Sequence, residues 1–115
     1  MSVAVVLGWK AYLRAGDDAA GRKLLLRLQE QLGTEMTLGE FQRDDEDSSV
    51  YRCTFTTELA LDDSGNAASA ALEAAGRLAP SWVVGGLPPQ RGLWGVATEG
   101  IAIAGVTWLH FSLED

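Results

Sequence analysis

The sequence has few of the residues from which active sites and covalent cross-links are built. Its 115 residues include one cysteine, Cys53, and one histidine, His110. A single cysteine excludes an intramolecular disulfide and fits a reducing compartment. No nucleophile elbow, zinc-protease, paired-cysteine or phosphate-binding motif occurs. We therefore expect no cofactor, no metal ion and no enzymatic activity.

Long apolar segments are also lacking. Residues 2–9 are apolar, but no basic residue precedes them and the apolar part is shorter than a membrane-spanning helix. We predict that they form a first strand, that the protein is cytoplasmic and that it does not contact a membrane. The net charge of −7 and the lack of a basic patch argue against direct binding of nucleic acid.

The negative charge that is present lies in one segment. Residues 35–63 contain nine acidic and two basic residues, which accounts for the whole net charge of −7. The centre of this segment is the run of four acidic residues from Asp44 to Asp47. Such a local charge produces a directional field, which can attract a basic partner and repel nucleic acid.

The hydrophobic pattern predicts alternating strands and helices in a single domain over residues 1–115. Two segments have helical periodicity, at 19–32 and 67–79. Strand patterns occur at 2–9, 34–43, 50–59, 82–84, 93–97, 101–103 and 106–113. The first six elements follow the order βαββαβ. We therefore predict an α+β fold, a two-layer ferredoxin-like sandwich extended by a C-terminal antiparallel meander.

Local signals set several boundaries within this fold. Asp17 and Asp18 offer an N-cap carboxylate to the first helix, and Gly33 is a natural residue to end it. Gly39 suggests a bulge or an edge position in the second strand, and the ferredoxin-like arrangement would place this strand at an edge of the sheet. In the last strand, the alternation places Thr107 with Leu109 on the more apolar face.

The acidic run has three interpretations. It is a solvated hairpin loop, a metal site or a docking surface for a basic protein. The metal interpretation is weak because a calcium loop needs alternating acidic positions and a glycine. If the hairpin forms, neighbouring acidic residues extend the field. The predicted partner-binding residues are Asp44, Asp45, Glu46, Asp47, Glu40, Glu58, Trp94 and Trp108.

The remaining reactive and aromatic residues have plain structural interpretations. Cys53 alternates with Tyr51 and Phe55, so we expect it to be buried rather than paired with His110 for catalysis. The chain has four tryptophans, and packing is the expected role of each. An exposed Trp94 or Trp108 beside a polar rim would instead be an interaction hot spot.

These observations favour a small acidic, non-catalytic binding module that inhibits or regulates a basic protein. Bacterial immunity proteins, which inhibit toxins such as nucleases, fit this physical description. The alternative is a small-molecule-binding or regulatory ferredoxin-like domain, expected to form a homodimer. An enzyme with paired carboxylates, for instance Glu58 with Asp62 or Asp63, ranks third because nothing in the spacing brings these groups together.

Overall fold

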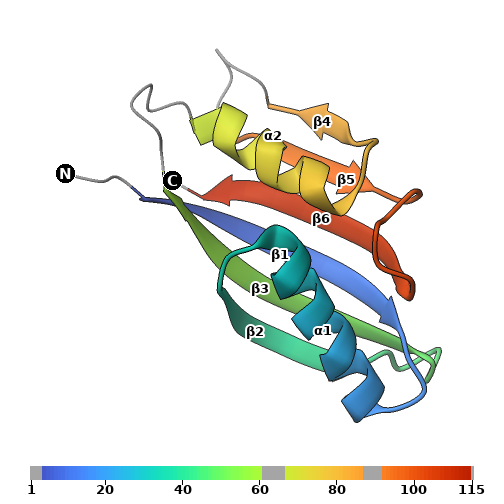
Figure 1. Cartoon of the computed structure of the whole chain (residues 1–115). Coiled ribbons are helices and arrows are strands. Elements are labelled where there is room, and N and C mark those ends of the chain that lie inside the picture. The colour runs from blue at the N-terminus through green and yellow to red at the C-terminus, as the bar shows by residue number, and fades with distance from the viewer. Residues whose placement is uncertain (1–3, 61–66, 87–91, 115) are drawn as a thin grey trace.

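The computed structural model describes residues 4–60, 67–86 and 92–114. Both helices within these residues lie on the same face of one antiparallel sheet, so the fold is α+β, as predicted (Figure 1). The strand order is β2-β3-β1-β6-β5-β4. Along the chain the elements are β1 (Ala4–Arg14), α1 (Asp18–Leu32), β2 (Met36–Arg43), β3 (Val50–Ala60), α2 (Ala67–Leu78), β4 (Val83–Gly85), β5 (Trp94–Ala97) and β6 (Val106–Glu114).

The boundaries of α1 are set by the predicted caps. The Asp17 carboxylate accepts a hydrogen bond from the Ala20 amide at 2.8 Å, which satisfies one of the free N–H groups of the first turn. Gly33 ends the helix in a left-handed conformation with a φ of 72°, and its amide donates to the Gln29 carbonyl at 3.0 Å. The predicted start and end of this helix are therefore confirmed to within one residue.

β1 lies inside the sheet and is longer than the predicted strand at 2–9. It pairs with β3 along all of its 11 residues and with β6 on its other side. Successive side chains alternate between the two faces of the sheet. Leu7, Trp9 and Leu13 are buried under the helices, whereas Lys10 and Tyr12 lie on the face opposite the helices, here called the open face.

The strand order does not confirm the predicted ferredoxin-like arrangement. The strand predicted at 82–84 as the sixth element is β4, which lies at the far edge of the sheet, and the strand that pairs with β1 beside β3 is β6. The strand predicted at 101–103 does not form. The Ala102 amide donates to the Leu78 carbonyl at 2.7 Å, and Ile103 is buried. This segment therefore satisfies the C-terminal end of α2 instead of pairing with a strand.

β2 is an edge strand with a bulge, as predicted from Gly39. The pairing register with β3 shifts between Leu38 and Phe41. The Glu40 amide donates to the Thr54 hydroxyl at 2.9 Å, and a Cβ atom at residue 39 would lie 2.7 Å from the same oxygen. Glycine therefore permits the close approach on which this bulge depends.

A second register shift corrects the predicted faces at the start of β6. Tyr12 pairs with Trp108, but Leu13 pairs with Val106. Val106 is therefore buried and Thr107 is exposed, the reverse of the expected alternation. A simple two-residue period cannot anticipate the extra residue of a bulge.

The core is organised around the buried side chain of Trp9. Its ring stacks on Phe55 of β3 with the centroids 5.8 Å apart, and it meets Phe111 of β6 at 5.7 Å. Trp82 approaches it edge-on at 6.4 Å, and the Trp82 indole donates to two carbonyls near the end of α2. The Trp9 indole donates to the buried Thr57 hydroxyl at 2.9 Å. One aromatic side chain thus connects three strands with the segment that follows α2.

Two other predicted segments fall wholly or partly outside the described residues. These are the turn predicted at 62–66 and the glycine- and proline-containing loop at 85–92.

We predict that Thr57→Val destabilises the protein. Valine has a similar shape, but it leaves the indole N–H of Trp9 buried without an acceptor, so the free energy of unfolding should fall by about 1–3 kcal/mol. Urea denaturation monitored by tryptophan fluorescence measures this change. The matched control is Thr56→Val on the open face, which should change the free energy of unfolding by less than about 0.5 kcal/mol. Equal effects of the two substitutions would contradict the assigned role of the hydrogen bond.

Candidate functional site on the open face

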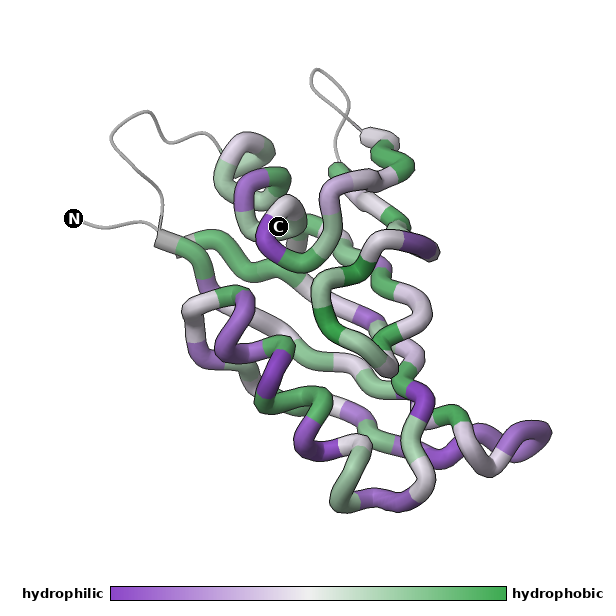
Figure 2. Tube along the Cα trace, turned by 45° about the vertical axis from the view of Figure 1, so that its right-hand side comes forward, coloured by the Kyte–Doolittle hydropathy of each residue, from purple (hydrophilic) through white to green (hydrophobic). Residues whose placement is uncertain are grey.

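The acidic loop, defined as Asp44, Asp45, Glu46 and Asp47, connects β2 with β3 at one end of the molecule. Figure 2 shows it as a hydrophilic segment that projects from the body of the protein. The Asp47 carboxylate accepts hydrogen bonds from the Ser49 hydroxyl at 2.6 Å and the Ser49 amide at 2.9 Å. These bonds, with a smaller effect of Arg14, hold the pKa of Asp47 below its usual value. Asp47 therefore has a structural role in closing the hairpin.

Arginines compensate part of the negative charge near this loop. Arg52 approaches the Asp44 carboxylate at 3.8 Å. On the helix side of the hairpin, Arg43 donates to the Tyr51 hydroxyl at 3.0 Å, and that hydroxyl donates to Asp18 at 2.7 Å. Among the described residues, the carboxylates of Asp45 and Glu46 have no hydrogen-bond or ion-pair partner. The uncompensated charge of the acidic loop is therefore concentrated on these two residues.

Three aromatic side chains, here called the aromatic row, cross the open face beside this end of the sheet. Tyr12 of β1 stacks on Trp108 of β6 with the centroids 4.8 Å apart, and Trp108 stacks on His110 at 5.9 Å. The side chain of Tyr12 is 40% exposed, so its ring remains accessible from solvent. Large flat side chains that are held rigidly and remain accessible are typical of interaction hot spots.

A groove of about 290 Å³ adjoins the aromatic row. Its lining includes the rings of Tyr12 and Trp108 and the charged residues Glu40, Arg52 and Lys10. Arg52 is the residue paired with Asp44, so the acidic loop borders this groove. We call it the Glu40 groove. It brings together two of the residues predicted from the sequence, Glu40 of β2 and Trp108 of β6, and Asp44 adjoins it through its ion pair with Arg52.

Two of the predicted residues, Glu58 and Trp94, lie away from both the groove and the acidic loop. Glu58 is near the opposite end of β3, where it lines a hollow with Thr34 and Glu35. Trp94 is on β5, and its ring covers Gly85 of β4. Trp94 is 38% exposed, so it remains accessible, but it is not part of the Glu40 groove.

A paired Cys53–His110 site is excluded by the fold. Cys53 lies under the helices and contacts the Ala11 carbonyl at 3.7 Å, whereas His110 lies on the open face. The burial predicted for Cys53 is confirmed. Among the described residues there is no group of acidic, histidine or cysteine side chains that could hold a metal ion. Asp62 and Asp63 lie outside the described residues, so their predicted pairing with Glu58 is not tested.

Sequence reasoning missed the contribution of β1 to this surface. Gly8, Lys10 and Tyr12 all lie on the open face, but the predicted strand ended at residue 9. The alternation of apolar and polar residues does continue as far as Arg14, and that signal would have placed Lys10 and Tyr12 on one face.

In the described part of the chain, no helix is both long and apolar enough to cross a membrane.

We predict that Cys53 does not react with thiol reagents in the folded protein. Burial raises the pKa of its thiol to about 12, so the reactive thiolate is scarce at pH 8 and reagents have no access to it. Labelling with iodoacetamide, followed by mass spectrometry, should therefore be complete in 6 M guanidinium and minimal in buffer. Rapid labelling under native conditions would contradict the packing described here.

Comparisons with known proteins supply no family assignment for this geometry. No protein-family model matches the chain, and no curated protein or solved structure matches it. The function is therefore argued from the open face and the acidic loop alone.

Proposed function

We propose that this chain is a small, acidic, non-catalytic binding module that inhibits or regulates a basic protein. In this proposal the partner docks on the open face at the Glu40 groove, beside the acidic loop. The observation that carries it is the meeting of Glu40 with the rings of Tyr12 and Trp108 in one accessible groove. A toxin inhibited by an immunity protein is one example of such a partner.

The groove has the chemistry that an arginine or lysine side chain requires. A cation over an aromatic ring is attracted by the negative face of the ring, and a nearby carboxylate adds a charge-assisted hydrogen bond. Among the described residues, Glu40 belongs to no ion pair. Its carboxylate is therefore available to a partner. Two cations also line the groove. Arg52 has an acidic neighbour in Asp44, which limits its repulsion of an incoming cation, whereas Lys10, which is in no ion pair among the described residues, opposes a cation at its end of the groove.

The loop and the groove have separate roles in this proposal. Exposed charges act at long range and mainly increase the rate of association, whereas buried contacts determine how slowly the complex dissociates. Asp45 and Glu46 therefore attract the partner, and Glu40 and Trp108 retain it. Asp44 and Asp47 hold the loop in shape through Arg52 and Ser49.

The first test is a pull-down from native lysate, followed by kinetics with the basic protein that is retained. Asp45→Asn with Glu46→Gln should lower the association rate several-fold at low salt, and this effect should vanish at high salt. Trp108→Ala should raise the dissociation rate about ten- to thirtyfold, and Glu40→Gln should have a similar but smaller effect.

Matched controls lie on the outer surface of α1. Leu26→Ala removes an exposed apolar side chain, and Glu30→Gln removes an exposed carboxylate, both far from the open face. Neither should alter the kinetics. Docking at the groove would be refuted by either of two results. The control variants could weaken binding of the basic protein as much as the groove variants do, or Trp108→Ala and Glu40→Gln could both leave its dissociation rate unchanged.

The second candidate is a regulatory ferredoxin-like domain that forms a homodimer. Four adjacent strands, β2-β3-β1-β6, together with α1 and α2 support this candidate, with β4 and β5 as an added hairpin. The uncovered sheet would then be a dimer interface. Sedimentation velocity distinguishes the two, because a homodimer has a concentration-dependent sedimentation coefficient that Trp108→Ala lowers. A monomer at all concentrations would leave only the first candidate.

A further inference from the structure

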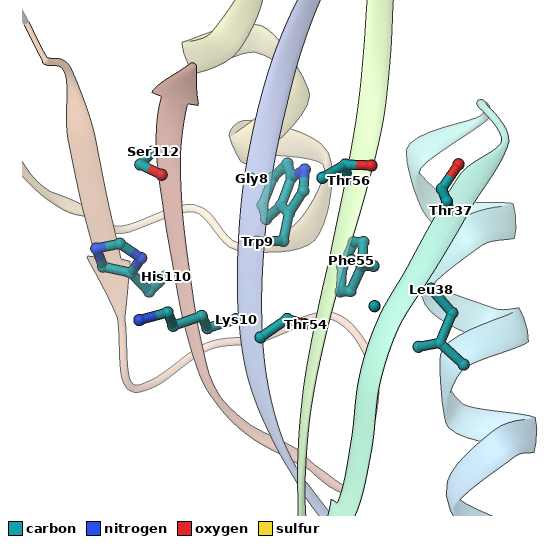
Figure 3. A pocket seen from close by; sticks show the side chains of 11 residues that line it. Gly8, Trp9, Lys10, Thr37, Leu38, Thr54, Phe55, Thr56, His110 and Ser112 are labelled. Atoms are coloured by element: carbon teal, nitrogen blue, oxygen red, sulfur yellow. The ribbon is translucent and has the colours of Figure 1, made fainter.

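A second hollow on the open face has a different chemistry from the Glu40 groove. It has a volume of about 360 Å³, within the range of about 300–1,000 Å³ that is usual for small-ligand pockets. We call it the Gly8 trough. Figure 3 shows it from the open face, and its lining includes Gly8, Lys10, Thr54, Thr56, His110 and Ser112.

The trough exists because the central strand has no side chain at its middle. Gly8 pairs with Thr56 of β3 on one side and with Ser112 of β6 on the other, so a position without a Cβ atom lies between two hydroxyl-bearing residues. One step along the same strands, Lys10 pairs with Thr54 and with His110. The surface of the trough is mostly apolar, and its Lys10 end carries the two basic side chains, Lys10 and His110.

The two basic groups at that end lie close enough to affect one another. Burial, and to a smaller extent the charge of Lys10, lowers the pKa of His110. Val96 of β5, the other strand neighbour of His110, carries no charge. The ion pairs among the described residues are Arg43–Asp18, Arg52–Asp44 and Arg77–Glu73, and Lys10 belongs to none of them. An anion placed here would interact favourably with both basic groups.

The opposite end of the trough defines the orientation of such an anion. Thr56 and Thr37 are shared with the neighbouring hollow, which is lined by the carboxylates of Glu35 and Glu58. An anionic group is repelled from that end and attracted to the Lys10 end. The remainder of the ligand would lie over Gly8, where the sheet offers mainly backbone and the methyl groups of threonines.

We propose that the Gly8 trough binds a small organic carboxylate, with the carboxylate held by Lys10 and His110 and an apolar body lying over Gly8. The hydroxyl of Thr54 accepts a hydrogen bond from the Glu40 amide, so its own proton remains available for the ligand. This site does not depend on the proposed basic partner. The two sites share Lys10 and Thr54, but Trp108 lines only the Glu40 groove and Gly8 lines only the trough.

The test uses benzoate as the probe and follows the isotope-labelled full chain by NMR at fixed ionic strength. Benzoate should shift the resonances of Gly8, Thr56 and His110 to saturation, while benzyl alcohol, which is similar in shape but uncharged, should bind at least about tenfold more weakly. His110 is the only histidine, so its titration is read without overlap.

The pH dependence gives a second readout. A bound carboxylate stabilises the imidazolium, so benzoate should raise the pKa of His110. By linkage, benzoate should bind more tightly as the pH falls through that pKa. Equal binding of benzyl alcohol, an unchanged pKa of His110, or shifts that map to another surface would each overturn the proposal.

Two variants test the two ends of the trough. Lys10→Met keeps the aliphatic stem and should weaken benzoate binding about tenfold, while Lys23→Met, the same change on the outer surface of α1, should leave it unchanged. Gly8→Val fills the floor and should abolish binding, with the amide spectrum reporting whether the fold is intact. Unchanged binding in Lys10→Met would overturn the proposal even if Gly8→Val failed to fold. Partner docking is tested separately by Trp108→Ala.

Discussion

The packing of Trp9 is the interaction on which the rest of this structure depends. Its ring lies between Phe55 and Phe111, which belong to the strands on either side of β1, and its indole N–H is satisfied by the buried hydroxyl of Thr57. Close packing and a satisfied polar group together specify one arrangement of the three strands. Trp82 adds the end of α2 to the same cluster. The same aromatic cluster therefore fixes both the register of the three central strands and the position of the end of α2 on the sheet.

The opposite face of the sheet is not covered by either helix. Because alternate residues of β1 point in opposite directions, the strand that holds Trp9 in the core also presents Gly8, Lys10 and Tyr12 on the open face. These residues are placed by a strand paired on both sides, so their spacing is fixed by the sheet and not by a loop. Sites built on such rigid elements need little reordering when a ligand or partner binds.

The sequence predicted local structure better than spatial arrangement. The caps of α1, the bulge at Gly39, the edge position of β2 and the burial of Cys53 followed from local chemistry. The position of β6 did not, because periodicity records which residues are apolar and not which strands are neighbours. Glu40 and Trp108 were proposed for separate reasons, charge and aromaticity. Only the fold shows that they line one groove, since the bulge and the pairing of β1 with β6 create it.

The pairing of β1 with β6 also has a consequence for how the chain acquires its structure during synthesis. The first and last described strands are neighbours inside the sheet, and β6 separates β1 from β5. Until β6 has left the ribosome, β1 has one unpaired side and Trp9 lacks Phe111. Contacts between segments so distant in sequence slow folding because a long loop must close first. The sheet is therefore completed only when β6 becomes available, and until then one side of β1 keeps unpaired backbone N–H and C=O groups.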